Sequence, residues 1–179
     1  FGAMGGTKDK NKGYDVLFKS LRRLYQKIYL ENVHFVIFGQ EDPGNSGLDF
    51  LETTWMGHVS DDEKLAVIYN SADMMIVPSR IENLPQSATE AQACGVPVIG
   101  FNCTGLIDAV DNGKTGLLVK PYSSEEMSEA IKLLIQDPLI CEQLGKNARL
   151  RALELWSSSK VHELYLDLFN RIAMAENDE

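Results

Sequence analysis

The chain has 179 residues, of which 44% are hydrophobic and 24% charged, an ordinary globular composition. Its net charge of −9 argues against a nucleic-acid partner, because affinity for a phosphate backbone comes largely from basic side chains. No stretch approaches the roughly 20 apolar residues of a membrane span. The three cysteines, Cys94, Cys103 and Cys141, form no CxxC pattern, which favours a reduced, cytoplasmic compartment.

Short apolar runs alternate with amphipathic segments along the whole chain. Phe1–Gly6 is expected to be the end of a strand that runs into a Gly-rich loop. The further predicted strands are Val33–Phe38, Gly57–Val59, Met74–Val77, Pro97–Phe101 and Gly116–Val119. The predicted helices are Tyr14–Leu30, Ser60 to Tyr69, Asn83 to Gly95, Leu106–Val110, Ser123 to Leu134, one from Asp137, and a C-terminal helix through Val161 and Ile172. Polar residues predict a loop over Glu41–Asp49.

Three helix starts carry capping signals. Ser60 to Glu63 and Ser123 to Glu126 have the spacing of capping boxes, and Asp137 precedes a proline at the first helical position. Alternating strands and helices predict an α/β fold, a doubly wound parallel sheet of about six strands with helices on both faces. We expect one domain over residues 1–179.

Two glutamates eight residues apart mark the most informative segment. Glu82 lies where the strand Met74–Val77 passes to the next helix. Glu90 lies about five residues into that helix, roughly 7.5 Å along its axis at 1.5 Å per residue. The carboxyl ends of parallel strands are where open α/β sheets bind ligands. Free N–H groups at a helix start attract phosphate. A helix start that attracts phosphate, flanked by two carboxylates, suits a ligand that has a diphosphate at its centre and hydroxyl groups at its ends. A nucleotide sugar is a ligand of this kind.

The segment from Met74 to Val119 closely resembles the C-terminal, donor-binding domain of retaining family 4 glycosyltransferases of the GT-B fold. The matching motifs are Pro78-Ser79, Glu82, Glu90-Ala91, Cys94-Gly95-Val96-Pro97-Val98, Thr104-Gly105 and Gly116-Leu117-Leu118-Val119. Lys12-Gly13 resembles the Lys-Gly element of that family. The resemblance implies one Rossmann-like half of a GT-B enzyme, whose N-terminal acceptor-binding domain is absent from this sequence.

The resemblance also implies a role for each matching residue. Glu90 would hold the ribose hydroxyls of the nucleotide, and Glu82 would lie beside the donor sugar. The backbone N–H groups of Asn83 and Leu84 would face the phosphates. Lys12 would neutralise the departing diphosphate, which is electrostatic stabilisation of the transition state.

The remaining expected contacts concern a second cation and the base. The family often has an Arg before its Lys; Lys8 is the available substitute here, a point charge rather than a bidentate fork. The base of the nucleotide is expected near Gly39, Gly57, His58 and Val59. Two alternatives stay open for His58: a structural residue of the loop, or a contact with the ligand.

The expected function is therefore transfer of a sugar from a nucleotide diphosphate sugar, with retention, to a glycan or lipid acceptor, as in polysaccharide biosynthesis. We expect no metal, since there is no Asp-x-Asp motif, and no transfer by this chain alone. Peripheral membrane association through the absent domain is left open. The alternatives are a nucleotide-binding or sensing module of the same fold, and a sugar-nucleotide epimerase or phosphorylase of related architecture.

Overall fold

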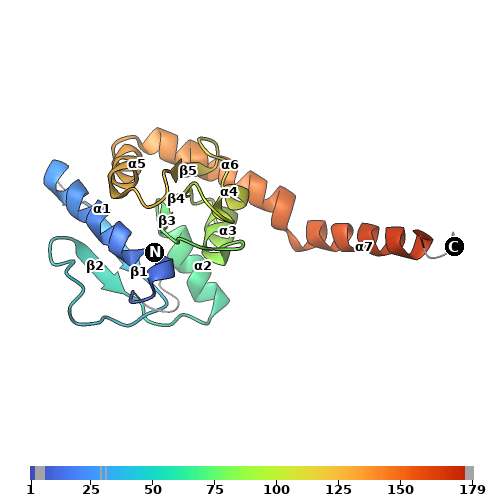
Figure 1. Cartoon of the computed structure of the whole chain (residues 1–179), viewed down its shortest axis with the longest axis horizontal. Coiled ribbons are helices and arrows are strands. Elements are labelled where there is room, and N and C mark those ends of the chain that lie inside the picture. Colours follow the sequence, from blue (N-terminus) through green and yellow to red (C-terminus); the bar gives the residue numbers. More distant parts are fainter. Residues whose placement is uncertain (3–6, 29, 31, 176–179) are drawn as a thin grey trace.

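The computed structural model describes residues 1–2, 7–28, 30 and 32–175. Its strands lie in two parallel sheets, and the named strands are β1 (His34–Ile37), β2 (Glu52–Trp55), β3 (Met75–Val77), β4 (Val98–Phe101) and β5 (Gly116–Val119). β1 pairs with β2, and the order of the second sheet is β3-β4-β5. The predicted α/β class with parallel strands is confirmed (Figure 1).

Helices alternate with these strands. They are the 3₁₀ turn η1 (Lys10–Lys12) and the helices α1 (Tyr14–Lys27), α2 (Asp62–Asn70), α3 (Gln86–Ala93), α4 (Leu106–Ala109), α5 (Ser124–Gln136), α6 (Pro138–Trp156) and α7 (Ser158–Ala175).

Successive side chains of the central strands enter different apolar clusters, as a sheet covered on both faces requires. Ile76 and Ile99 pack in one cluster with residues of α1 and α5. Met75, Val77 and Val98 pack in the other, with residues of α2, α3 and α4. Each face of the sheet is thus buried under its own helices, and the carboxyl ends of the strands are left for the loops.

The strand prediction was wrong in number and in one position. The described residues contain five named strands rather than about six, because Phe1 and Gly2 contribute only a bridge to Phe38; residues 3–6 of the expected opening loop lie outside the described part. The strand expected at Gly57–Val59 lies instead at Glu52–Trp55, and Gly57 makes an isolated antiparallel bridge with Gln40.

Two of the three predicted helix caps are confirmed. Asp137 accepts a hydrogen bond from the Ile140 N–H at 3.0 Å, and Ser123 accepts one from the Glu126 N–H at 3.1 Å. The third was wrong by one residue, because the N-cap of α2 is Asp61 rather than Ser60. Its carboxylate accepts from the Lys64 N–H at 3.0 Å, a charge-assisted bond that a hydroxyl cannot match.

A cavity of about 840 Å³ lies between the two sheets, lined mainly by apolar side chains that include Phe35, Met75 and Ile131. None of Lys12, Glu82 and Glu90 lines it, so this cavity is separate from the predicted site.

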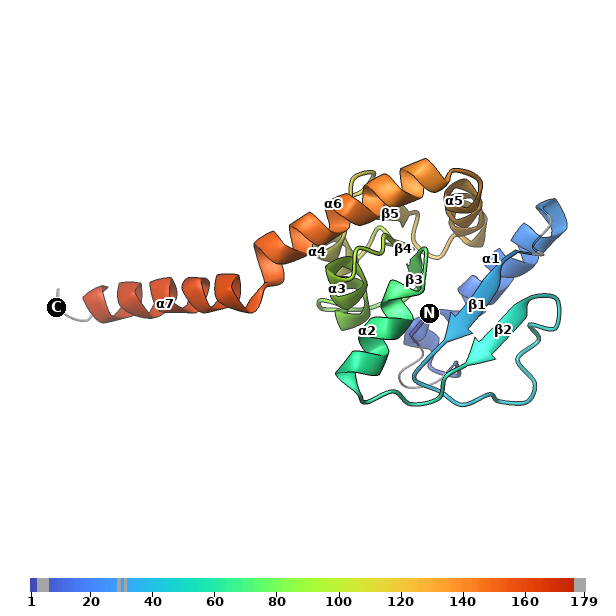
Figure 2. The ribbon, with the colours of Figure 1, turned by 180° about the vertical axis from the view of Figure 1, so that it is seen from behind.

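The last helix, α7, projects from the body of the molecule, as both views show (Figures 1 and 2). Apart from the partly buried Lys160, its described side chains are exposed, including the large apolar Leu164, Tyr165 and Phe169. Among the described helices, none combines the length and the apolar character needed to cross a membrane.

Candidate active site

Glu82 lies in the loop between β3 and α3, on the carboxyl side of the sheet, as predicted. Its backbone is held by the loop that follows β4: the Gly105 N–H donates to the Glu82 carbonyl at 2.9 Å, and the Glu82 N–H donates to Thr104 Oγ1 at 3.3 Å. Two neighbouring loops at the carboxyl edge therefore fix the direction in which Glu82 projects.

The close approach of these loops depends on Gly105. A Cβ atom placed on Gly105 would lie 1.5 Å from the Asn83 carbonyl oxygen and 3.0 Å from that of Glu82. No side chain fits in that space, so the Thr-Gly pair of the sequence motif has a direct structural reason.

Lys12 forms an ion pair with Glu82, with Nζ and Oε1 2.9 Å apart. The two side chains are 28% and 19% exposed, so the pair is partly shielded from water. Lys12 reaches it from η1, which ends at Gly13 with a φ of 67°. A Cβ at Gly13 would lie 1.9 Å from the Pro78 carbonyl oxygen, so only glycine lets η1 approach the end of β3 this closely.

Glu90 lies on α3 and accepts a hydrogen bond from the Tyr69 hydroxyl at 2.9 Å. Tyr69 is only 3% exposed, and its ring packs edge-on against Phe38 with centroids 5.6 Å apart. Burial of the hydroxyl, followed by the charge of Glu90, raises the pKa of Tyr69, so it stays a donor at neutral pH. One oxygen of Glu90 is thereby oriented, and the other accepts no hydrogen bond from any described residue.

The residues expected around the base are brought together only in part. Gly39 donates its N–H to the Gly57 carbonyl at 2.7 Å, which joins the segments after β1 and β2. His58 is exposed, whereas Val59 is partly buried against the cluster that contains Phe38 and Tyr69. Val59 thus has a packing role in this structure.

The residues expected at the phosphates are accessible. Asn83 and Leu84 are exposed, and within the described residues neither of their backbone N–H groups has a protein acceptor. Pro85 is the N-cap of α3. Lys8 is exposed and forms no ion pair with any other described residue.

Sequence reasoning gave no site role to three residues that shape the site: Tyr69, Arg80 and Thr104. Tyr69 was treated only as part of a predicted helix. Thr104 was named only as part of the Thr104-Gly105 motif, although its φ of 49° is an uncommon conformation for a non-glycine residue. Arg80 lies beside the motif residue Ser79, but its partners are far away in the sequence.

Among the described residues, no group of three or more His, Cys, Asp or Glu side chains is placed to hold a metal ion.

Comparison with known proteins identifies the family. A sequence profile described as "Glycosyl transferases group 1" matches residues 4–151, so the chain belongs to this family. The capsular polysaccharide biosynthesis glycosyltransferase CapM of Staphylococcus aureus is 33% identical over 169 residues, covering 90% of this chain and 43% of CapM.

Solved structures agree with that assignment. Sucrose-phosphate synthase from Thermosynechococcus elongatus superposes with a TM-score of 0.79 at 29% identity, over 93% of this chain and 44% of that one. HepE from Anabaena, solved in complex with UDP, superposes with a TM-score of 0.76 at 20% identity, over 91% and 46% of the two chains, which shows the shared fold. The chain thus spans less than half the length of each of these three proteins.

Proposed function

We propose that this chain is the donor-binding, C-terminal half of a retaining family 4 glycosyltransferase, and that residues 1–179 form one domain that binds a nucleotide diphosphate sugar. The acceptor-binding domain would belong to the rest of the longer protein. The observation that carries the proposal is the Lys12–Glu82 pair, which places a cation and a carboxylate together beside the start of α3.

In this proposal, each group meets one part of the donor. The N–H groups of Asn83 and Leu84 and the Lys12 ammonium face the diphosphate, and Glu90 accepts hydrogen bonds from the ribose hydroxyls. When the bond between the anomeric carbon and the phosphate oxygen breaks, the negative charge grows on the diphosphate, where Lys12 stabilises it. Glu82 faces the positive character that develops on the sugar.

Tyr69 supports the ribose assignment. By occupying one oxygen of Glu90 from the buried side, its hydroxyl leaves the other available to a ligand. CapM is named a capsular polysaccharide biosynthesis glycosyltransferase, another similar structure is a sucrose-phosphate synthase, and HepE was solved with UDP. These names support a nucleotide sugar as the donor. A cytoplasmic location stays a prediction from the unpatterned cysteines.

The proposal is tested by calorimetry and thermal unfolding with UDP, GDP and ADP in EDTA. One of them should bind without metal and, at about 100 times its Kd, stabilise the chain by roughly 2.7 kcal/mol. Binding that needs Mg²⁺ or Mn²⁺ would contradict the metal-free site, and no binding by any of the three would contradict the donor assignment.

A product assay separates transfer from nucleotide sensing. The full-length protein should form a glycosylated acceptor, and this chain alone should form none because a catalytic cleft needs a second wall. Nucleotide binding without any transfer by the full-length protein would favour the sensing module.

A further inference from the structure

The turn that carries Lys12 has no hydrophobic anchor of its own. None of the three residues of η1 is buried, so apolar packing does not fix where Lys12 lies. Within the turn, the Asp9 carboxylate accepts from the Asn11 N–H at 2.9 Å, and the Lys12 N–H donates to the Asp9 carbonyl at 3.1 Å. These local bonds shape the turn but do not attach it to the sheet.

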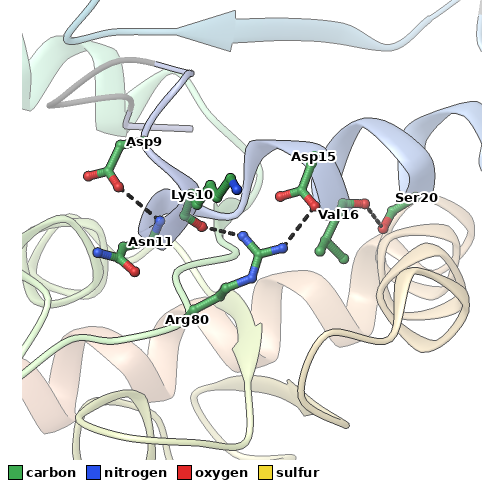
Figure 3. A network of polar contacts seen from close by, with 7 residues as sticks. All are labelled: Asp9, Lys10, Asn11, Asp15, Val16, Ser20 and Arg80. Atoms are coloured by element: carbon green, nitrogen blue, oxygen red, sulfur yellow. Dashed lines mark hydrogen bonds and ion pairs between the residues drawn. The ribbon is translucent and has the colours of Figure 1, made fainter.

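Arg80 provides that attachment (Figure 3). Its backbone N–H donates to the Asn11 carbonyl at 2.7 Å, and one guanidinium nitrogen donates to the Lys10 carbonyl. The other terminal nitrogen donates to Asp15 Oδ2 at 2.8 Å, at the start of α1. A planar guanidinium can serve two acceptors at once, which a lysine ammonium cannot do with the same fixed geometry.

Arg80 is itself held from a third loop. Its guanidinium lies over the ring of Tyr122, 5.7 Å from the centroid, and that ring packs edge-on against the buried Phe101. The side chain of Arg80 is 24% exposed. It therefore joins the turn before α1, the loop after β3 and the loop after β5.

We propose that Arg80 is a positioning residue that places Lys12 against Glu82 and the donor diphosphate by holding the turn at Lys10 and Asn11. This inference rests on the proposed function for the role of Lys12, but the attachment itself does not. Both terminal nitrogens of Arg80 already donate to the protein, so we assign Arg80 a role through Lys12 rather than at the phosphate.

A double-mutant cycle tests the coupling. With whichever of UDP, GDP and ADP binds the unaltered chain, Arg80→Met should weaken affinity about tenfold, the scale of a lost bond to a charged group. In a Lys12→Met background, the same change should cost less than about twofold, because the residue it positions is gone. Equal losses in both backgrounds would overturn the proposal and indicate direct phosphate contact, as would an unchanged affinity in the first background.

Amide hydrogen exchange tests the attachment without any nucleotide. In Arg80→Met, the N–H groups of Lys12 and Gly13 should exchange about tenfold faster, whereas those of Leu21 and Ile99 in the core should be unchanged. Unchanged exchange at Lys12 and Gly13, or an equal rise at all four positions, would overturn a local positioning role.

Arg171→Met is the matched control, since Arg171 pairs with Asp167 within α7. That helix projects away from the part of the molecule that holds the N-terminus (Figure 2). It should alter neither affinity nor exchange. If no nucleotide binds the unaltered chain, the proposed function fails, and the exchange measurement alone still decides whether Arg80 holds the turn.

Discussion

Glu90 and Glu82 differ in their surroundings, and this difference predicts separate effects on kinetics. Glu90 is held by Tyr69, whereas Glu82 pairs with Lys12. In the proposed function, the contact of Glu90 with ribose should therefore be equal in the ground and transition states. In the full-length enzyme, Glu90→Gln should raise the KM for the donor and weaken nucleotide binding by roughly 1.5–3 kcal/mol.

In the proposed function, Glu82 faces the charge that develops on the sugar, so Glu82→Gln should lower kcat while nucleotide affinity does not weaken. Losing the carboxylate also frees Lys12 from its ion pair, which favours the diphosphate. Steady-state kinetics with varied donor and nucleotide titrations of both variants decide the matter. Normal turnover at saturating donor together with weaker nucleotide binding in Glu82→Gln would reverse the two roles.

Asp15 gives a prediction about pH. Its hydrogen bond from Arg80 lowers the pKa of the carboxyl below the ordinary 3.8 in the folded chain. The unfolded chain therefore binds this proton more readily, so the stabilisation is present above about pH 4 and is lost as the pH falls through the folded pKa.

Because the Asp15 side chain is 54% exposed, Asp15→Asn should cost less than about 1 kcal/mol at pH 6. That difference should shrink towards zero near pH 3. Urea unfolding of both chains at several pH values measures it, and a difference that grows on acidification would contradict the assignment.

At the scale of elements, the contact between the loops after β3 and β4 predicts that the stability of the fold is unusually sensitive to substitution of Gly105. Gly105→Ala should destabilise the chain by about 3 kcal/mol, because a Cβ there overlaps the Asn83 carbonyl and the loops must separate. Gly113→Ala is the control: it meets nothing within 4 Å and has only a left-handed φ of 77° to accommodate, which costs about 1 kcal/mol. Chemical unfolding compares the two, and equal losses would show that the loops can rearrange freely.

The elements that the sequence predicts well are those with strong local signals. β3 and β4 are short apolar runs buried at every position, and β5 is an apolar run whose two middle residues are partly buried. α6 begins at Pro138 because the acidic cap Asp137 and the proline both favour a helix start there. β2 was misplaced because its residues Glu52–Trp55 are exposed or only partly buried, which leaves little hydrophobic contrast to locate the strand.

The site could be predicted as a set of residues but not as a set of contacts. Glu82, Glu90 and Lys12 follow from motifs, whereas the partners that hold them come from elsewhere in the chain. Lys12 meets Glu82 across 70 positions, and Arg80 meets Lys10 across the same interval. Local sequence patterns cannot predict such contacts, because only the folded topology brings these residues together.

For the molecule as a whole, the projection of α7 predicts that it adds little to the stability of the body. Its residues belong to neither apolar cluster, and the family match ends at residue 151. Ending the chain after Ser157 should change the free energy of unfolding by less than about 0.5 kcal/mol. The shorter chain should also associate less, because it lacks the exposed apolar side chains of α7.

Urea unfolding and gel filtration at several concentrations measure these two effects. A loss of stability above about 2 kcal/mol would mean that α7 folds back onto the body in solution.

The distance in sequence between Lys12 and Glu82 has a consequence for the order of events during synthesis. Each of β3, β4 and β5 pairs in parallel, so a helix must form and cross the sheet before the next pairing is made. Such strand pairings form slowly, because closing the loop of intervening chain costs conformational entropy before the contacts between the strands can stabilise it. A growing chain in which only η1 and α1 have been synthesised therefore holds Lys12 without its partner Glu82 until α3 and β4 have followed. The proposed site thus forms late, together with the sheet, and no early-folding segment contains it.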